Sequence, residues 1–96
     1  MTTRSALQII RDHYAASARG DLAGMLADAA DDIAWTEMAG FPTAGTWVGV
    51  PQIIEHVFKP VGAQWDHFAY TPERLVDGGD TIVAIGGYSA VHRATG

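Results

Sequence analysis

Cysteine is absent from this chain of 96 residues. Its absence excludes disulfide bonds, thiolate nucleophiles and zinc sites built on cysteine. A protein without cysteine is compatible with a reducing compartment.

Long hydrophobic runs and clusters of basic residues are also lacking. No apolar run approaches the roughly 20 residues that span a bilayer, and Gln8, Arg11 and Asp12 interrupt the segment where a signal peptide would need a continuous apolar core. The six basic residues are scattered and the net charge is −5, which disfavours nucleic acid and anionic membranes as partners. The sequence therefore predicts a soluble, cytoplasmic protein that binds neither.

The composition is that of a globular protein, with 48% apolar and 18% charged residues. The length predicts a single domain over residues 1–96. A domain this small buries a modest fraction of its surface, so dimerisation would stabilise it.

Two helices are predicted at the N-terminus. Ser5 and Gln8 fit a capping box, although Thr2 or Thr3 could cap instead, and apolar residues then recur at helical spacing over 3–19. Gly20 is a suitable stop, and Asp21 is a suitable cap for a second helix that extends to about Ala29.

The middle of the chain predicts two short strands and a third helix. Alternation over 33–37 indicates the first strand, and 46–48 indicates a very short second one. Pro51 lies near the first turn of the third helix, where its missing N–H costs nothing, and Pro60 with Gly62 is expected to end that helix.

The remainder predicts a long hairpin with arms 64–76 and 81–93. Its turn is 77–80, where paired glycines supply positive φ angles. Pro72 suggests a sheet edge or a bulge, and Gly86-Gly87 suggests a bend. Helices followed by antiparallel strands predict the α+β class.

This order of motifs resembles the nuclear-transport-factor-two-like cone fold, in its SnoaL-like and ketosteroid-isomerase-like branch. The residues that carry the resemblance are 14–16, 20–22, 25–26, 31–35, 45–49, 53–58, 73–76 and 79–80. The resemblance implies a cone in which three N-terminal helices pack on a curled antiparallel sheet. The last one or two strands of the family are missing after Gly96, so the chain is either a fragment or a protein whose partner supplies that sheet edge.

Glu37 is the first candidate for chemistry. It shares a strand face with Ile33 and Trp35, which is costly for a carboxylate unless that face lines a cavity or provides a partner. The resemblance places Glu37 at the position of the catalytic carboxylate of ketosteroid isomerases, which moves a proton next to a carbonyl. The alternative is a carboxylate at a pocket mouth or paired with an arginine.

His13 is the second candidate, because the resemblance places it where the isomerases have an oxyanion-binding tyrosine. An imidazole can donate a hydrogen bond as a phenol does, with different geometry. The neighbouring Tyr14 is either a ligand contact or a core residue. No acidic residue lies between Thr81 and Gly96 to serve as the second donor, which argues against steroid isomerisation itself.

Aromatic and histidine side chains are the candidates for ligand binding. The predicted set is Tyr14, Trp35, Phe41, Trp47, Trp65, His67 and Tyr88. His67 and His92 are expected to lie diagonally across the hairpin. With Glu37 they could in principle hold a metal, but the spacing matches no known signature, and a polar lining of an apolar pocket is favoured. No metal and no organic cofactor are predicted.

The resemblance thus implies a small cofactor-independent enzyme of the isomerase, cyclase or hydrolase type. It would act on an apolar small molecule and form a homodimer through the outer face of its sheet. The alternative is a non-catalytic module of the same fold that binds a small ligand or serves dimerisation.

Overall fold

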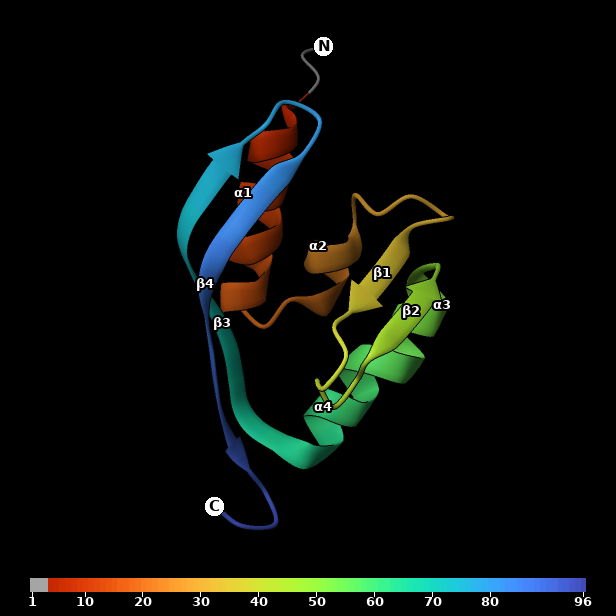
Figure 1. Ribbon diagram of the computed structural model, residues 1–96, viewed down its shortest axis with the longest axis vertical. Coiled ribbons are helices and arrows are strands. Elements are labelled where there is room, and N and C mark those ends of the chain that lie inside the picture. The colour runs from red at the N-terminus through yellow and green to blue at the C-terminus, as the bar shows by residue number, and fades with distance from the viewer. Residues whose placement is uncertain (1–3) are drawn as a thin grey trace. The chain divides into compact units, whose positions relative to one another are not determined.

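The structure is a computed structural model that describes residues 4–96. The chain divides into two compact units, and Figure 1 labels their helices and strands. The first unit combines the N-terminal segment up to Asp28 with Ala69–Ser89, and the second combines Ala29–Phe68 with Ala90–Gly96. Helices and antiparallel strands confirm the α+β class. The alternative caps Thr2 and Thr3 lie outside the described residues.

The helices of the first unit are capped by Ser5 and Asp21, as the sequence predicts. Helix α1 (Ala6–Ala18) starts after Ser5, whose Oγ accepts a hydrogen bond from the Gln8 amide at 3.1 Å. Gly20 has φ +70°, as its role at the helix end requires. Asp21 caps α2 (Leu22–Leu26) by accepting from the Gly24 amide at 2.9 Å. Helix α2 is shorter than predicted, because the Ala27 amide bonds to the Gly24 carbonyl and closes the last turn.

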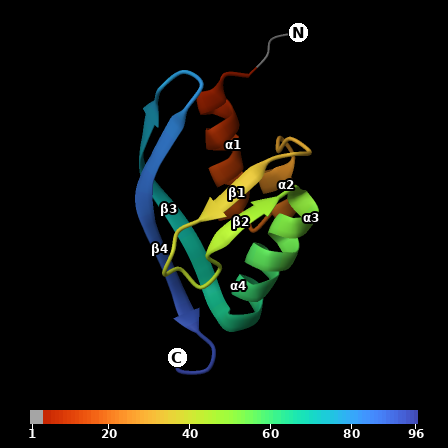
Figure 2. The ribbon, with the colours of Figure 1, turned by 45° about the vertical axis from the view of Figure 1, so that its right-hand side comes forward.

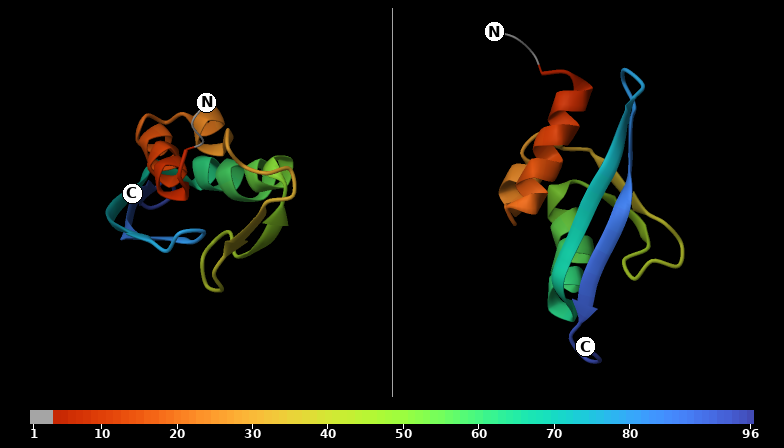
Figure 3. Two further views of the ribbon diagram at one scale, coloured as in Figure 1. Left: turned by 90° about the horizontal axis from the view of Figure 1, so that it is seen from above. Right: turned by 90° about the vertical axis from the view of Figure 1, so that its left-hand side faces the viewer.

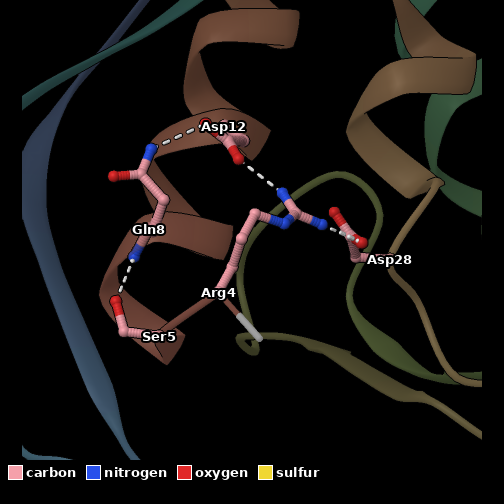
Figure 4. Close-up of polar contacts among 5 residues, drawn as sticks. All are labelled: Arg4, Ser5, Gln8, Asp12 and Asp28. Atoms are coloured by element: carbon pink, nitrogen blue, oxygen red, sulfur yellow. Dashed lines mark hydrogen bonds and ion pairs between the residues drawn. The ribbon is translucent and has the colours of Figure 1, made fainter. Parts of the chain in front are cut away.

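A polar cluster ties the start of α1 to the end of the α2 segment (Figure 4). The Arg4 guanidinium pairs with both Asp12 and Asp28, and Gln8 Nε2 donates to Asp12 Oδ1 at 2.8 Å. The hydrogen bond from Gln8 and the pairing with Arg4 lower the pKa of the Asp12 carboxyl. Ala16 and Leu26 are the buried residues of the two helices.

The second unit contains an antiparallel pair of strands, β1 (Ala34–Glu37) and β2 (Gly45–Val48) (Figure 2). Trp35 pairs with Trp47, and Glu37 pairs with Gly45. Trp35, Glu37 and Trp47 are half-buried, whereas Thr36 and Thr46 occupy the exposed face. The pair therefore presents its two tryptophans and its carboxylate on one face.

The third helix continues past its predicted end. It consists of α3 (Val50–Ile53), a π-helical turn η1 (Ile54–Phe58) and α4 (Lys59–Gln64). Pro60 does not stop it, because the proline falls in the first turn of α4, where its missing N–H is tolerated. Ile53, fully buried, and Val57 form the core side of this segment.

Strands β3 (Trp65–Asp77) and β4 (Ile82–His92) form the predicted hairpin, and they run side by side in both views of Figure 3. The Gly78 amide bonds to the Thr81 carbonyl at 2.8 Å, and Gly79 has φ +86°. Only the second of the two glycines therefore supplies a positive φ. Gly78 is needed for a different reason. The Thr81 backbone lies so close that a Cβ at position 78 would be 2.7 Å from the Thr81 carbonyl oxygen.

Two further positions shape this hairpin. A Cβ on Gly86 would collide with the Thr71 carbonyl oxygen and lie 2.9 Å from Pro72 Cα, so the two backbones approach closely at the predicted bend. At the open end, the Arg93 amide bonds to the Gln64 carbonyl at 3.0 Å, and Arg93 Nε donates to Asp66 Oδ1 at 2.8 Å.

Candidate functional site

Glu37 lies at the end of β1, on the half-buried face of the strand pair. Trp35, two residues earlier, projects to the same face and donates from its indole Nε1 to Glu37 Oε1 at 3.0 Å. Trp35 is the only hydrogen-bond donor to this carboxylate among residues 4–96. The predicted conflict between a carboxylate and an apolar strand face is resolved by an indole N–H and not by an arginine.

The helical segment of the second unit packs its rings against these tryptophans. Phe58 meets Trp35 edge to face, with ring centroids 5.7 Å apart at 67°. His56 stacks on Trp47, with centroids 4.3 Å apart and planes 11° from parallel. Both rings come from η1, and single π-helical turns occur frequently at functional sites. We call Trp35, Trp47, His56 and Phe58 the tryptophan cluster.

Thr43 lies in the loop between β1 and β2 and belongs to the same neighbourhood. Its carbonyl accepts from Trp47 Nε1 at 3.4 Å. The Trp47 ring covers Gly45, where a Cβ would lie 2.9 Å from the indole Cζ2. Thr43 is only 6% exposed, and its hydroxyl has no hydrogen-bond partner in the described chain.

Sequence reasoning missed three residues of this neighbourhood. From the sequence alone, Phe58 and His56 fall within the third predicted helix, and Thr43 falls between the two short predicted strands. The proline that follows Phe58 and Lys59 could have drawn attention to an irregular helix, but no sequence signal places Thr43.

Three other predicted ligand-binding residues belong to the second unit. Phe41 lies in the turn of the β1–β2 loop, where its amide bonds to the Met38 carbonyl at 3.1 Å. Trp65 packs against His92, with ring centroids 4.7 Å apart. His67 is exposed and has φ +55°, which interrupts the alternation of β3.

His13 belongs to the first unit, on α1. Its Nδ1 lies 2.8 Å from the Met25 carbonyl oxygen, which can only accept, so Nδ1 carries the proton of this bond. In the neutral ring Nε2 is then an acceptor. The neutral ring therefore has no second N–H for the donor role that the resemblance implies.

Tyr14 and Tyr88 are joined through a residue that sequence reasoning did not select. Tyr70 on β3 lies between them, with ring centroids 5.1 Å from Tyr14 and 4.8 Å from Tyr88. Burial raises the pKa of the Tyr14 phenol, and the neighbouring Tyr70 and Tyr88 raise it further. Tyr14 thus contacts other aromatic rings in its unit.

The structure therefore groups the predicted site residues within each unit. Glu37, Trp35 and Trp47 come together in the second, and Tyr14 and Tyr88 meet through Tyr70 in the first. Within residues 4–96, no three metal-ligating side chains form a cluster that could hold an ion. No helix in the same range has the length and apolarity to cross a bilayer.

Residues 10–96 match the family of SnoaL-like domains. Among solved structures, the chain is similar to an NTF2-like protein from Burkholderia thailandensis, with 48% identity and a TM-score of 0.94. The match covers 98% of this chain and 72% of that one. An NTF2-like protein of unknown function from Burkholderia pseudomallei has 26% identity and a TM-score of 0.85, over 96% of this chain and 72% of the other.

A third NTF2-like protein, from Burkholderia xenovorans, has 29% identity and a TM-score of 0.70, over 99% of this chain and 72% of that protein. No curated protein sequence matches the chain. The matches confirm the family resemblance and the fold, and they show that the chain is shorter than these structural neighbours.

Proposed function

Because the chain belongs to the SnoaL-like family, we propose that it is a small enzyme in which Glu37 transfers a proton to or from an apolar small molecule. The reaction would be of the isomerase, cyclase or hydrolase type, which share such a step. No metal or organic cofactor takes part in the proposed step.

The observation that carries this proposal is the setting of Glu37. Its carboxylate is half-buried beside two tryptophans and is held by one indole N–H. Because Trp35 binds Oε1, the carboxylate has a defined orientation and Oε2 can accept a proton. A base needs such positioning before its proton affinity matters.

The tryptophan cluster supports an apolar ligand with a flat portion. Trp35, Trp47 and Phe58 offer large apolar surfaces, and ligand sites are typically lined by such side chains with a few polar groups among them. Phe41, Trp65 and His67, which belong to the same unit, stay proposed ligand contacts. The roles of His13, Tyr14 and Tyr88, which belong to the other unit, stay predictions from the sequence.

One observation favours the non-catalytic alternative. The indole–carboxylate bond between Trp35 and Glu37 is internal to one strand, so it also serves to satisfy a half-buried carboxylate. In that case Glu37 stabilises β1 and the family fold only binds a ligand.

Deuterium exchange tests the proposal. Purified protein is mixed with 2-acetylnaphthalene, an apolar ketone, in D₂O, and loss of the methyl proton signal is followed by NMR. We expect the wild-type chain to accelerate exchange and Glu37→Gln to reduce the acceleration by about 100-fold or more, as loss of a general base does. Glu55→Gln is the matched control, because Glu55 is exposed and pairs with Lys59.

Binding without accelerated exchange would favour the non-catalytic module. Acceleration that survives in Glu37→Gln would contradict the role of Glu37.

We also propose that the protein works in the cytoplasm as a homodimer formed through the outer face of β4. Val83 and Ile85 lie on that face, 50% and 47% exposed, while their neighbours Ile82 and Ala84 are half-buried. Exposed apolar side chains side by side on a sheet are typical of interaction surfaces.

A further inference from the structure

His56 is a polar side chain of the tryptophan cluster to which the proposed function gives no chemical role. Its imidazole is exposed and stacks on the Trp47 ring, with centroids 4.3 Å apart and planes 11° from parallel. Within residues 4–96, neither ring nitrogen of His56 has a hydrogen-bond partner. The stack therefore holds the face of the imidazole, while both nitrogens at its edge remain available to a ligand that arrives from solvent.

The Trp47 ring connects His56 with the position of Glu37. The indole leans back along β2 over Gly45, where a Cβ would lie 2.9 Å from the indole Cζ2. Gly45 is the cross-strand partner of Glu37, and side chains at such paired positions are neighbours on one face. The indole thus occupies the place beside Glu37 that a side chain of residue 45 would fill. Because His56 stacks on this indole, the imidazole and the carboxylate both lie next to the same ring.

A second contact anchors the His56 segment to the face that carries Glu37. Phe58, two residues after His56 on η1, packs edge to face against Trp35, with centroids 5.7 Å apart. Trp35 is the residue that donates to the Glu37 carboxylate. The π-helical turn therefore contacts both tryptophans of this face, one on each strand.

We propose that His56 is a catalytic residue that donates a hydrogen bond from its imidazole to the carbonyl oxygen of a ketone substrate. The inference rests on the proposed function and names its substrate class, an apolar ketone with a hydrogen on the carbon next to the carbonyl. Glu37 takes that proton, the C–H electron pair forms the C=C bond of an enolate, and the carbonyl electrons move to oxygen. The His56 N–H stabilises the charge that develops on this oxygen. Return of the proton from Glu37 to the carbon restores the ketone.

The protonation state of His56 affects the strength of this hydrogen bond. The charged groups on the elements around His56 are Glu37 of β1 and the ion pair of Glu55 with Lys59, which are 3.1 Å apart, while β2 carries none. An imidazolium donates a stronger hydrogen bond than the neutral ring, and histidine generally changes charge between about pH 5 and pH 8. The enzymatic rate should therefore fall by about tenfold as the pH rises through this range.

The deuterium-exchange assay with 2-acetylnaphthalene tests this role through two substitutions at one position. His56→Phe keeps a ring on Trp47 and removes the N–H, whereas His56→Gln keeps a donor and removes the ring. We expect His56→Phe to lower kcat by about 100-fold with little change in KM, and to abolish the fall of the rate with pH. His56→Gln should retain at least about tenfold more activity than His56→Phe. Equal activity in the two variants, or a more active His56→Phe, would show that this side chain only packs on Trp47, and would overturn the inference.

His92→Phe is the matched control, because His92 also packs against a tryptophan of the same unit, with its ring centroid 4.7 Å from that of Trp65. It should keep the wild-type kcat and pH profile. If Glu37→Gln loses the acceleration and His56→Phe keeps it, the role of His56 fails and the proposed function stands. A wild-type chain that does not accelerate exchange would contradict the proposed function, and this inference with it.

Discussion

Trp35 donates its indole N–H to Glu37 at 3.0 Å, from a position two residues earlier on the same strand. The bond is local, because both side chains project from the same face of β1. The ring that supplies the N–H also packs edge to face against Phe58, which fixes the indole. The carboxylate is therefore oriented by a donor that is itself held by the helical segment.

Trp35→Phe should separate the two roles of this side chain. Phenylalanine keeps a ring against Phe58 and loses the N–H, so we expect a loss of about 1–2 kcal/mol in the free energy of unfolding. Urea denaturation followed by circular dichroism measures it. Trp47→Phe is the control, because its bond to the Thr43 carbonyl is longer, at 3.4 Å, and involves no charge. Equal losses in the two variants would show that the hydrogen bond to Glu37 stabilises the fold no more than the bond from Trp47 to the Thr43 carbonyl does.

Gly86 and Gly87 are adjacent and should respond very differently to alanine. A Cβ at Gly86 would meet the Thr71 carbonyl oxygen and Pro72 Cα, whereas one at Gly87 would meet nothing within 4 Å. We expect Gly86→Ala to destabilise the protein by about 2 kcal/mol or more, as overpacking against backbone does, and Gly87→Ala to change stability by less than about 0.5 kcal/mol. Paired thermal melts check this, and similar Tm values for the two variants would refute the close approach.

Asp12 should contribute to the acid sensitivity of the protein. Its pKa is lowered in the folded state by Gln8 and Arg4. The contribution is therefore complete above the unfolded pKa near 4 and is lost as the pH falls through the lower folded value. We expect Asp12→Asn to flatten the fall of Tm between about pH 4 and pH 2. Asp32→Asn, at an exposed turn, is the control and should keep the wild-type slope.

Ile85→Lys tests the proposed homodimer. A charge on the outer face of β4 would oppose burial of Val83 and Ile85 between two copies. We expect the mass measured by sedimentation equilibrium to fall from that of a dimer to that of a monomer. Thr81→Lys adds the same charge in the hairpin turn and should remain dimeric. A wild-type chain that is monomeric at about 100 µM would contradict the dimer.

The helix caps, the glycine conformations and one strand face could be predicted from the sequence, because one or two residues determine each of them. Ser5 and Asp21 cap their helices as expected, and Gly20 and Gly79 have the positive φ angles that their positions require. The face shared by Trp35 and Glu37 followed from strand alternation alone. These features depend on residues that are close together along the chain, so they can be predicted from the sequence.

What could not be predicted depends on how distant segments meet. Pro60 predicted a helix end, but the preceding π-helical turn places it at the start of α4, where it is tolerated. His92 packs against Trp65, a pairing that the sequence did not indicate. The burial of Thr43 has no sequence signal, since a loop between two strands is ordinarily exposed.

Hydrogen bonds at both ends of the β3–β4 hairpin fix its register. Gly78 bonds to Thr81 at the turn, and Arg93 bonds to Gln64 and Asp66 at the open end. A slip of one residue would move every side chain of β4 to the opposite face, and it could not occur without breaking the bonds at both ends. The hydrogen bonds at the two ends therefore determine which way Val83 and Ile85 point, and only a chain that lost both sets would be free to present an inverted β4 to its surroundings.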